Sequence, residues 1–388
     1  MPDGSETQLI RVIGGIGEIN ADDWDACAGA DDPFVRHAFL TALEESGSVS
    51  AEAGWMPHHL VLEDENAVVL AVAPLYLKNH SYGEYVFDWG WADALHRAGG
   101  QYYPKLQAAV PFTPVTGRRL LVRQDLAPEK QRALQTALLS GLVQLAERLK
   151  VSSFHITFPS EQEWRLCGEL GLLQRTDRQF HWINDGFETF DDFLAALSSR
   201  KRKGIRKERR AIAEKDVVIQ TLRGDQIEQR HWDAFYSFYQ DTSDKKWGQA
   251  YLNRDFFSHL GETMRENVLL IMAEIEGRFV GGALNMIGGD TLYGRYWGCL
   301  GNFKFLHFEV CYYRAMDFAI EAGLKRVEAG AQGHHKLQRG YLPNATYSAH
   351  WIANTGFRKA VERFLIEETD AIKDEIDSLV DHSPFKRS

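Results

Sequence analysis

Apolar positions recur along the chain at helical and strand spacing, and they predict the same order of elements in each half. In the first half, Leu134, Leu138, Leu142, Leu145 and Leu149 share one face of a helix. The helices expected in this half are 37–45, 127–149 and 161–170, and the strands are 58–64, 67–78, 84–89, 151–158 and 180–183. Segment 90–119, rich in aromatic residues, glycine and proline, is a long connection, and such connections are often functional.

The second half follows the same plan of helix, strand hairpin, third strand, helix and strand. Its expected helices are 191–214, 227–240, 253–264, 308–322 and 356–380, and its strands are 217–222, 268–275, 278–287, 291–299, 326–330 and 347–354. Hairpin strands are antiparallel, which favours α+β domains over an alternating parallel βαβ array. We predict an α+β protein of mixed α/β content with two domains, 1–186 and 187–388, each a mixed, mostly antiparallel sheet flanked by helices.

Composition changes this picture little. The 388 residues are 44% hydrophobic and 25% charged, which is typical of a globular protein rather than a disordered or fibrous one. No apolar run reaches the roughly 18 residues that a membrane span needs. The polar start, Met1 to Glu6, lacks the pattern of a signal peptide, so a cytoplasmic protein is expected.

Cysteine spacing gives no sign of a metal site. Cys27, Cys167, Cys299 and Cys311 form no C-x-x-C pair and none lies with histidine at zinc-ligand spacing. Neither a disulfide framework nor a bound metal is therefore predicted.

The charge is uneven along an acidic chain. The net charge is −10, yet eight of the eleven residues from Arg200 to Arg210 are basic and Glu208 is the only acid among them. One interpretation is a helix that contacts phosphates of tRNA or of a nucleotide-linked precursor. Alternatives are a solvated amphipathic helix and a helix that meets an anionic membrane surface. The phosphate-binding candidates here are Lys201, Arg202, Arg206 and Arg210.

Two polar stretches are candidates for chemistry. In the second half, residues 328–340 follow a predicted strand and contain Glu328, His334, His335, Lys336 and Arg339. Glu328 lies within the predicted strand and should be partly buried, so its carboxylate should be either paired or functional. The alternative is a solvated turn with one salt bridge to Glu328.

In the first half, aromatic and charged residues cluster after the predicted strand 84–89. Asp88 ends that strand, where a general base could point into a cleft. Aromatic walls with a few charges are typical of a ligand pocket, although a tryptophan-rich edge of the core is an equal alternative. The substrate-binding candidates are Trp89, Trp91, His96, Tyr102, Tyr103 and Lys105, with Tyr296 lining a second cleft in the other half.

Two stretches resemble a known family. LYGRYWGCLGNFKFLHFEVCYYRAMDFAIEAGLKRVEAGAQGHHKLQRGYLP, Leu292 to Pro343, resembles the second acyltransferase domain of FemABX-type proteins. EYVFDWGWADALHRAG at 84–99 and YYPKLQAAVPFTPVTG at 102–117 resemble a FemAB-like branch of N-acyltransferases. This resemblance covers most of the chain. It implies two tandem GNAT-like domains and acyl transfer to an amine, and it is the main support for Lys336 as a catalytic residue. From the two polar stretches, Glu328, Asp88 and His335 are further catalytic candidates, and Arg339 and His334 are substrate-binding candidates.

The resemblance leaves the acyl donor open. FemABX proteins use aminoacyl-tRNA and a peptidoglycan precursor, whereas ordinary GNAT proteins use acyl-CoA. The best match to the GNAT phosphate loop is Arg295, Gly298 and Gly301, with Leu300 where a small residue is expected. We expect an N-acyltransferase that transfers an aminoacyl or acyl group to an amine acceptor of cell-envelope synthesis. Alternatives are an acyl-CoA-dependent N-acetyltransferase of a small molecule or protein, and a non-catalytic binder of an envelope precursor or RNA.

Overall fold

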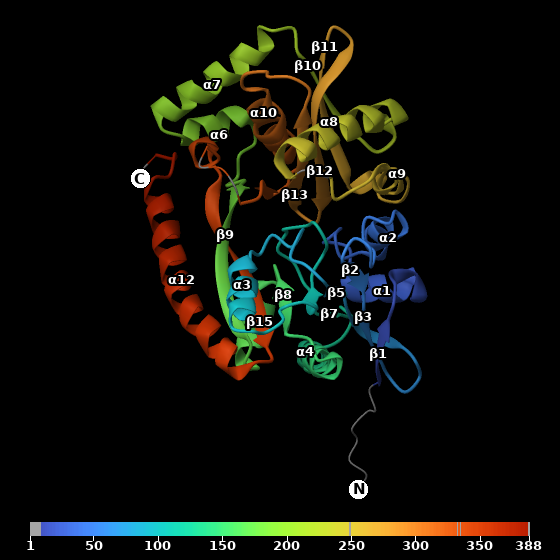
Figure 1. Cartoon of the computed structure of the whole chain (residues 1–388). Coiled ribbons are helices and arrows are strands. Elements are labelled where there is room, and N and C mark those ends of the chain that lie inside the picture. The colour runs from blue at the N-terminus through green and yellow to red at the C-terminus, as the bar shows by residue number, and fades with distance from the viewer. Residues whose placement is uncertain (1–8, 248–249, 332, 334, 387–388) are drawn as a thin grey trace. The chain divides into compact units, whose positions relative to one another are not determined.

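The chain forms two compact units in this computed structural model, which describes residues 9–247, 250–331, 333 and 335–386 (Figure 1). Unit 1 contains Met1–Asp177 and Thr346–Ala371, and unit 2 contains Arg178–Ala345 and Ile372–Ser388. Each unit is therefore built from two separate segments, whereas the expected domains, 1–186 and 187–388, are each one continuous segment.

Unit 1 contains two sheets and five helices among the described residues. Its elements are β1 (Leu9–Ile13), a 3-10 turn (Ile16–Glu18), α1 (Ala21–Ala28), α2 (His37–Glu45), β2 (Trp55–Pro57), β3 (His59–Glu63), β4 (Val69–Ala73), β5 (Leu75–Lys78), α3 (Trp89–Arg97), β6 (Lys105–Ala108), β7 (Leu121–Val122), α4 (Pro128–Leu149), β8 (Ser153–Thr157) and α5 (Glu161–Glu169). The smaller sheet is antiparallel, with the order β1-β3-β4-β7.

Unit 2 contains one main sheet with helices on it. Its elements are α6 (Phe190–Ala196), α7 (Ser199–Ala213), β10 (Val218–Arg223), α8 (Gln229–Trp247), α9 (Arg254–Thr263), β11 (Val268–Ile275), β12 (Arg278–Gly288), β13 (Thr291–Cys299), α10 (Leu306–Phe308), a π-helix (Glu309–Tyr313), α11 (Arg314–Glu321), β14 (Arg326–Glu328), and 3-10 turns at Gly224–Gln226, Arg265–Asn267 and Leu337–Arg339. β9 (Leu173–Ile183), β15 (Leu342–Ile352) and α12 (Thr355–Asp381) each contain residues of both units.

The main sheets of the two units share one pairing pattern. In unit 1, β2, β5 and β6 pair antiparallel, β6 and β8 pair parallel, and β8 pairs antiparallel with Ser348–Ile352 of β15. In unit 2, β11, β12 and β13 pair antiparallel, β13 and β14 pair parallel, and β14 pairs antiparallel with β9. The predicted fold class, α+β with mixed, mostly antiparallel sheets flanked by helices, is confirmed.

The main sheet of unit 1 has one apolar and one polar face, because successive side chains of a strand point to opposite sides. The apolar face packs in a core with α4 and α5 and carries Leu75, Leu106, Ala108, Phe154, Ile156 and Ala349. The alternate positions are buried but polar: Tyr76, Lys78, Lys105, Gln107, Ser153, His155, Thr157, Ser348 and His350. A buried polar face of this size is the feature that most distinguishes this unit.

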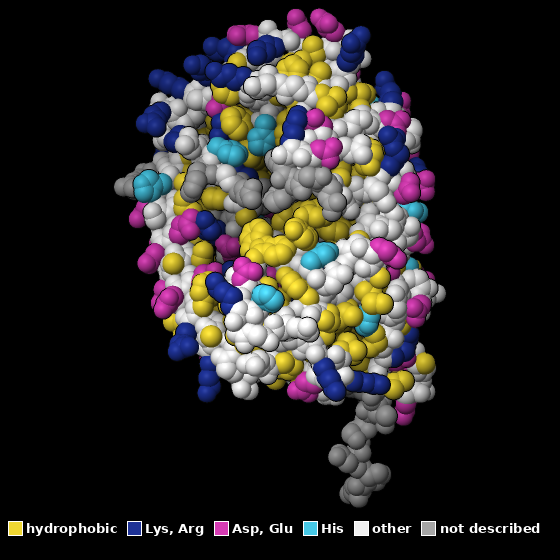
Figure 2. All heavy atoms as spheres, in the orientation of Figure 1, with side chains coloured by type: hydrophobic (Ala, Val, Ile, Leu, Met, Phe, Trp, Pro, Cys, Tyr) yellow, Lys and Arg dark blue, Asp and Glu magenta, His cyan; other side chains and the backbone are white. Residues whose placement is uncertain are grey.

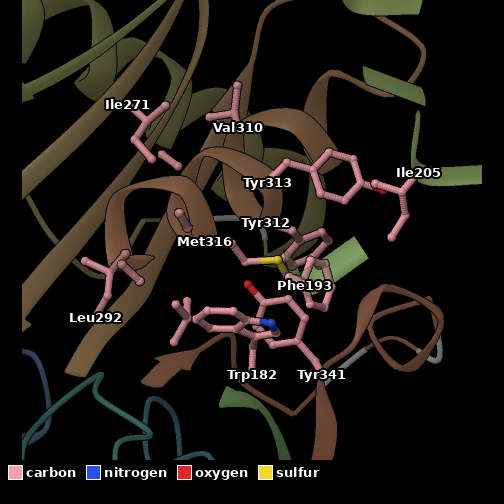
Figure 3. Packing of buried hydrophobic residues seen from close by; sticks show 14 of the residues in the cluster. Trp182, Phe193, Ile205, Ile271, Leu292, Val310, Tyr312, Tyr313, Met316 and Tyr341 are labelled. Carbon is pink, nitrogen blue, oxygen red and sulfur yellow. The ribbon is translucent and has the colours of Figure 1, made fainter. Parts of the chain in front are cut away.

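The core of unit 2 combines aliphatic and aromatic side chains and joins β9 to the helices. Figure 3 shows Trp182 and Tyr341 packed together beneath Tyr312, with Tyr313 extending toward Ile205 of α7. All five side chains are almost completely buried. Helix α7 is thereby anchored through its apolar positions to the helix that follows β13.

Three predicted elements are wrong. The expected strand 67–78 is two strands, β4 and β5, which belong to different sheets and are separated by Pro74, a residue that lacks an amide hydrogen. Segment 84–89 is not a strand, because Glu84 and Asp88 turn inward to a lysine. The expected helix 191–214 is two helices, because the chain is extended at Leu197 and Ser198.

We predict that Gly298→Ala lowers the free energy of unfolding by about 1–3 kcal/mol, measured by urea denaturation. Gly298 lies within β13, and a Cβ there would be 2.1 Å from the backbone oxygen of Phe238 in α8. The matched control is Gly204→Ala in α7, where no atom lies within 4 Å of the added Cβ. That change should stabilise the helix by roughly 0.5–1 kcal/mol. Equal effects of the two variants would contradict this account of β13.

Candidate functional site

The candidate site of unit 2 lies where β13 and β14 separate. The two strands pair in parallel only from Thr291 to Tyr293, after which β14 ends at Glu328 and β13 continues alongside β12. The chain then turns at Gly330, whose φ is +74°. Lys336 returns to this point, and its Nζ donates hydrogen bonds to the backbone oxygens of Gly330, at 3.0 Å, and of Ala329.

Lys336 is buried without a carboxylate partner among the described residues. Its side chain is held by backbone oxygens, and the burial lowers its pKa to about 8. The alternative of a salt bridge from this turn to Glu328 is therefore wrong for Lys336. A cation that lacks a formal counter-charge keeps its electrostatic field for a ligand, which suits a group that stabilises developing negative charge.

Glu328 is also buried, and it faces the strand beside it. Its Oε1 is 3.2 Å from Nε of Arg326, and its Oε2 is 3.7 Å from Nε2 of His181 on β9. Burial lowers the pKa of His181 to about 3, so this imidazole is neutral at physiological pH. The pairing with Arg326 gives Glu328 a structural partner, and its catalytic role stays a prediction.

Arg339 and His335 are held by side chains of unit 2. The Arg339 guanidinium binds Glu208 of α7, and His335 Nε2 lies 2.9 Å from the hydroxyl of Tyr312. His334 lies outside the described residues. His335, Lys336 and Arg339 therefore all have partners within unit 2. Arg339 in particular binds Glu208 instead of being open to a substrate.

The expected phosphate loop is mostly strand. Arg295 and Gly298 lie within β13, where Gly298 allows close approach of α8, and only Gly301, with φ +114°, follows the strand. Tyr296 is also on β13, with its ring 5.2 Å from that of Tyr239 and the Arg295 guanidinium 5.3 Å from its centre. Gly298 therefore has a packing explanation, and phosphate binding at these positions stays a prediction.

Helix α7 has an inner face with apolar and ion-paired side chains and an outer face with basic side chains. Its inner face contains the buried Ile205 and Ile212 and the half-buried Glu208 and Arg209. Arg206 pairs with Asp191, and Arg209 pairs with Asp317 and Glu309. In the described part of the chain, the remaining basic side chains have no carboxylate partner: Arg200, Lys201, Arg202, Lys203, Lys207 and Arg210. Figure 2 shows the Lys and Arg side chains gathered over this helix.

A second cluster of buried charges lies on the polar face of the unit 1 sheet. Lys105 on β6 is completely buried and binds Asp88 at 2.5 Å, Glu84 at 2.7 Å and the Ser81 hydroxyl at 2.8 Å. Lys78 on β5 lies opposite Lys105, with its Nζ 3.8 Å from Glu84 and 3.5 Å from the centre of the Trp55 ring. Two lysines and two carboxylates therefore share one buried layer.

Hydrogen bonds extend this cluster across the sheet. The Tyr102 hydroxyl donates to Asp88 at 2.7 Å and lies 3.2 Å from Nε2 of His155 on β8. Nδ1 of His155 is 2.7 Å from Nδ1 of His350 on β15. The hydroxyl of Ser348 in turn contacts His350 at 2.9 Å. Polar groups from four strands and the 81–103 segment are thus joined.

Burial and pairing set the protonation of these groups. Burial lowers the pKa of Lys78 to about 7 and raises that of Glu84 to about 7. Burial alone would raise the pKa of Asp88, but the Lys105 charge holds it well below its usual value. Burial lowers the pKa of His155 to about 3. Asp88 is consequently a weak base, and its geometry favours holding Lys105 over abstracting a proton.

The other first-half candidates are divided between this cluster and the surface. Tyr103 joins it through Ser81, whose hydroxyl lies 2.9 Å away. Trp91 is buried, with its ring 4.8 Å from that of His350. Trp89 is exposed beside Tyr82, and His96 is exposed in the last turn of α3. The structure therefore gathers Asp88, Tyr102, Tyr103 and Lys105 as expected, but not His96.

Sequence reasoning missed Lys78, Glu84, His155 and His350. A signal was present, since polar residues occupy every second position in Y-L-K at 76–78, K-L-Q at 105–107, S-F-H-I-T at 153–157 and S-A-H at 348–350. Strands with this alternation have one polar face. That the polar face is buried depends on side chains of segment 81–103, such as Glu84, Asp88 and Tyr102, which pack on it and which no strand pattern could reveal.

The described residues contain neither a candidate metal cluster nor a candidate membrane span. No group of three or more His, Cys, Asp or Glu side chains has an arrangement that could hold a metal ion. No helix among them combines the length and apolar character needed to cross a membrane.

Comparison with known proteins identifies relatives over nearly the whole chain. The sequence profile of the FemAB-like family, described as peptidoglycan biosynthesis and recognition, matches residues 15–387. A search of curated proteins found no match.

Solved structures share the fold at low sequence identity. A FemX structure has a TM-score of 0.56 at 12% identity and covers 89% of this chain and 98% of its own. The C-terminal domain of a putative lysylphosphatidylglycerol synthetase from Agrobacterium fabrum has a TM-score of 0.53 at 10% identity, covering 88% and 96%. L-PGS from Bacillus licheniformis has a TM-score of 0.50 at 10% identity, covering 87% and 98%. These likenesses show that the chain has the fold of those proteins.

We predict that Lys105→Met destabilises the protein by roughly 3–5 kcal/mol at pH 8, because it leaves buried carboxylates without their partner. Burial raises the pKa of Glu84 to about 7 and the Lys105 charge opposes this rise, so Glu84 is mostly ionised beside Lys105 at pH 8 and mostly protonated at pH 5. The destabilisation should therefore be smaller at pH 5 than at pH 8, as measured by urea denaturation at both values.

The control for this change is Arg165→Met. Arg165 pairs with Glu161 in an exposed position on α5, where a salt bridge contributes little to stability. A loss at Lys105 that is independent of pH, or no larger than that at Arg165, would contradict the ionic account of the unit 1 cluster.

Proposed function

The chain belongs to the FemAB-like family of peptidoglycan biosynthesis and recognition, and we propose that it transfers an aminoacyl group from aminoacyl-tRNA to an amine of a cell-envelope precursor in the cytoplasm. Membership confirms the expected function class, an acyl or aminoacyl transferase of cell-envelope biosynthesis. The donor, the acceptor and the residues that act are the proposed part.

The observation that carries the proposal is the position of Lys336. It is a buried cation at the end of β14, beside the point where a parallel strand pair separates, and it has two backbone oxygens as partners. Its ammonium group has three N–H donors, so it can keep these contacts and direct a third at a substrate oxygen. Transition-state stabilisation needs a donor placed in advance and shielded from water.

The reaction balances with few protein groups. The amine nitrogen of the acceptor attacks the ester carbonyl carbon of the aminoacyl-tRNA, and the carbonyl oxygen becomes an oxyanion. Lys336 stabilises that oxyanion. The carbon–oxygen bond to the ribose then breaks, and the proton lost by the amine is transferred to the ribose oxygen. Holding the two substrates together supplies much of the rate.

The outer face of α7 supports tRNA as the donor. Six of its basic side chains have no carboxylate partner among the described residues, and such a row of cations suits a phosphate backbone. Acyl-CoA is less well supported, because Arg295 and Gly298, its expected phosphate ligands, lie within a strand. A membrane surface with anionic lipid or a binder without catalytic activity would be revealed by the experiments below.

We predict that Lys336→Met lowers the turnover of aminoacyl transfer by about a hundredfold or more, with little change in melting temperature. The assay uses tRNA charged with labelled amino acids and a nucleotide-linked peptidoglycan precursor. Because burial places the pKa of Lys336 at about 8, the wild-type rate should fall as pH rises through this value and the ammonium is lost. The opposite dependence, with a rate that rises through pH 8, would make Lys336 a base.

The matched control is Lys325→Met, which removes an exposed lysine of the same unit that pairs with Asp290. It should retain wild-type turnover. Normal turnover in Lys336→Met would remove this residue from the mechanism, and absence of transfer by the wild-type protein with any charged tRNA would reject the proposed function itself.

We predict that the triple change of Lys203, Lys207 and Arg210 to Gln weakens tRNA binding and leaves the fold intact. Each lost phosphate contact should reduce the slope of log affinity against log salt by about 0.7 to 0.9. Filter binding at several salt concentrations measures both quantities. Vesicles with and without anionic lipid, tested in parallel, distinguish a membrane surface from tRNA.

A second triple variant controls for net charge. Arg230, Arg254 and Arg265 belong to the same unit and each pairs with a carboxylate. Their replacement by Gln removes the same number of positive charges away from α7. If both triple variants lose affinity equally, binding is a general effect of charge and the assignment to α7 is wrong.

A further inference from the structure

An ion pair between Glu208 and Arg339 connects the basic helix α7 to the segment that carries Lys336. Arg339 is buried and Glu208 is half-buried. Nη2 of Arg339 lies 2.7 Å from Oε1 and 2.9 Å from Oε2 of Glu208, and Nε of Arg339 lies 3.2 Å from Oε2. The side chains are 8% and 18% exposed. Two-pronged contacts of this kind are stronger and more directional than those of a lysine.

Tyr313 and Phe308 complete this contact. The Tyr313 hydroxyl donates to Glu208 and accepts from Nε of Arg339 at 3.0 Å. The guanidinium lies 3.4 Å from the centre of the Phe308 ring, and its Nη1 donates to the backbone oxygen of His335 at 2.8 Å. The contact therefore joins α7, the helix after β13 and both ends of the segment 335–339.

The π-helix Glu309–Tyr313 explains how one helix supplies two tyrosines to this segment. Tyr312 reaches His335 at 2.9 Å while its neighbour Tyr313 reaches Arg339. Successive residues of a regular α-helix are about 100° apart, whereas a π-helical turn is wider and is frequent at functional sites. In Figure 3, Tyr313 extends from this helix toward Ile205, whereas Tyr312 lies nearer to Trp182 and Tyr341.

Glu208 would be out of place if α7 were only a solvated basic face. It is the only acid among eight cations in Arg200–Arg210, and it points inward to Arg339, which is 131 residues away. Removing the Glu208 and Arg339 charges from water costs free energy, and only a specific contact between them offsets that cost. Among the residues that the structure describes, the hydrogen-bond partners of Lys336 Nζ are two backbone oxygens of its own turn, so its position depends on what holds His335 and Arg339.

We propose that Glu208, Arg339 and Tyr313 form a clasp that positions Lys336 for transfer and fixes it relative to the basic face of α7; this inference rests on the proposed function. The three are positioning residues and touch no reacting atom. Glu208 and the outward cations belong to the same helix. The clasp therefore fixes the position of the Lys336 ammonium relative to a polyanionic donor that is bound to α7.

The test measures Lys336 directly, without relying on activity. Competitive acetylation with acetic anhydride over a series of pH values, followed by mass spectrometry, gives the titration midpoint of its Nζ. In the wild-type protein we expect a midpoint of about 8, because Nζ is buried. In Glu208→Gln the segment loosens, and the midpoint should move toward the ordinary lysine value. Turnover should fall by about tenfold to a hundredfold, with KM for tRNA unchanged.

Asp317→Asn is the matched control. Asp317 pairs with Arg209 of the same helix at 2.6 Å and has similar exposure to Glu208, but it does not contact the 335–339 segment. It should leave the Lys336 midpoint and turnover as in the wild type. An equal shift in both variants, or wild-type labelling and turnover in Glu208→Gln, would overturn the clasp.

Tyr313→Phe keeps the test decisive if Glu208→Gln does not fold. It removes one hydroxyl of the clasp, and a smaller shift of the Lys336 midpoint in the same direction is expected, while wild-type behaviour would overturn the proposal. The two proposals fail separately. If the midpoint shifts in the clasp variants while the wild-type protein transfers no aminoacyl group, the clasp is supported and the proposed function is rejected.

Discussion

One parallel strand pair within an otherwise antiparallel sheet is the constraint on which both units depend. Parallel neighbours cannot be joined by a hairpin, so the chain must cross over through a helix. Helix α4 makes this crossover between β6 and β8, and the helix of residues 306–321 makes it between β13 and β14. The short strand β14 ends while β13 continues, and this mismatch leaves the position that Lys336 occupies. The tandem GNAT-like fold expected from the family resemblance is confirmed.

The two units place buried charge beside this pair in different ways. In unit 1, Lys105 meets two carboxylates within hydrogen-bond distance, so the charges compensate one another and stiffen a polar layer. In unit 2, Lys336 donates to two backbone oxygens and has no carboxylate partner in the part of the chain that the structure describes. A compensated cluster specifies a structure at a desolvation cost, whereas an uncompensated cation retains its field for a substrate. This contrast is the reason why we propose unit 2 as the place of chemistry.

The sequence predicts the regular elements well and the site only in part. Helix α4 and strands β11 to β13 follow directly from apolar periodicity, and the family resemblance led to Lys336. Pattern could not reveal that Pro74 divides one apolar run between two sheets, since each part alone is a good strand. It also could not reveal that Glu84 points inward, because its partner Lys105 becomes adjacent only in the folded sheet. The inward direction of Glu208 was visible as helical spacing with Ile205 and Ile212 but had no partner in the local sequence.

The acidic background of the chain bears on the proposed contact between α7 and a polyanion. A protein with a net charge of −10 repels a polyanion from most of its surface, so attraction is confined to the place where cations are concentrated. A helix with basic side chains all round would bind such a partner in many rotations. Here Glu208 and Arg209 face inward to ion pairs and Ile205 and Ile212 face the core, which leaves a single outward face. The fold therefore converts a run of charge that is nearly uniform in sequence into a surface with one direction, and the Glu208–Arg339 pair ties that surface to the segment that carries Lys336.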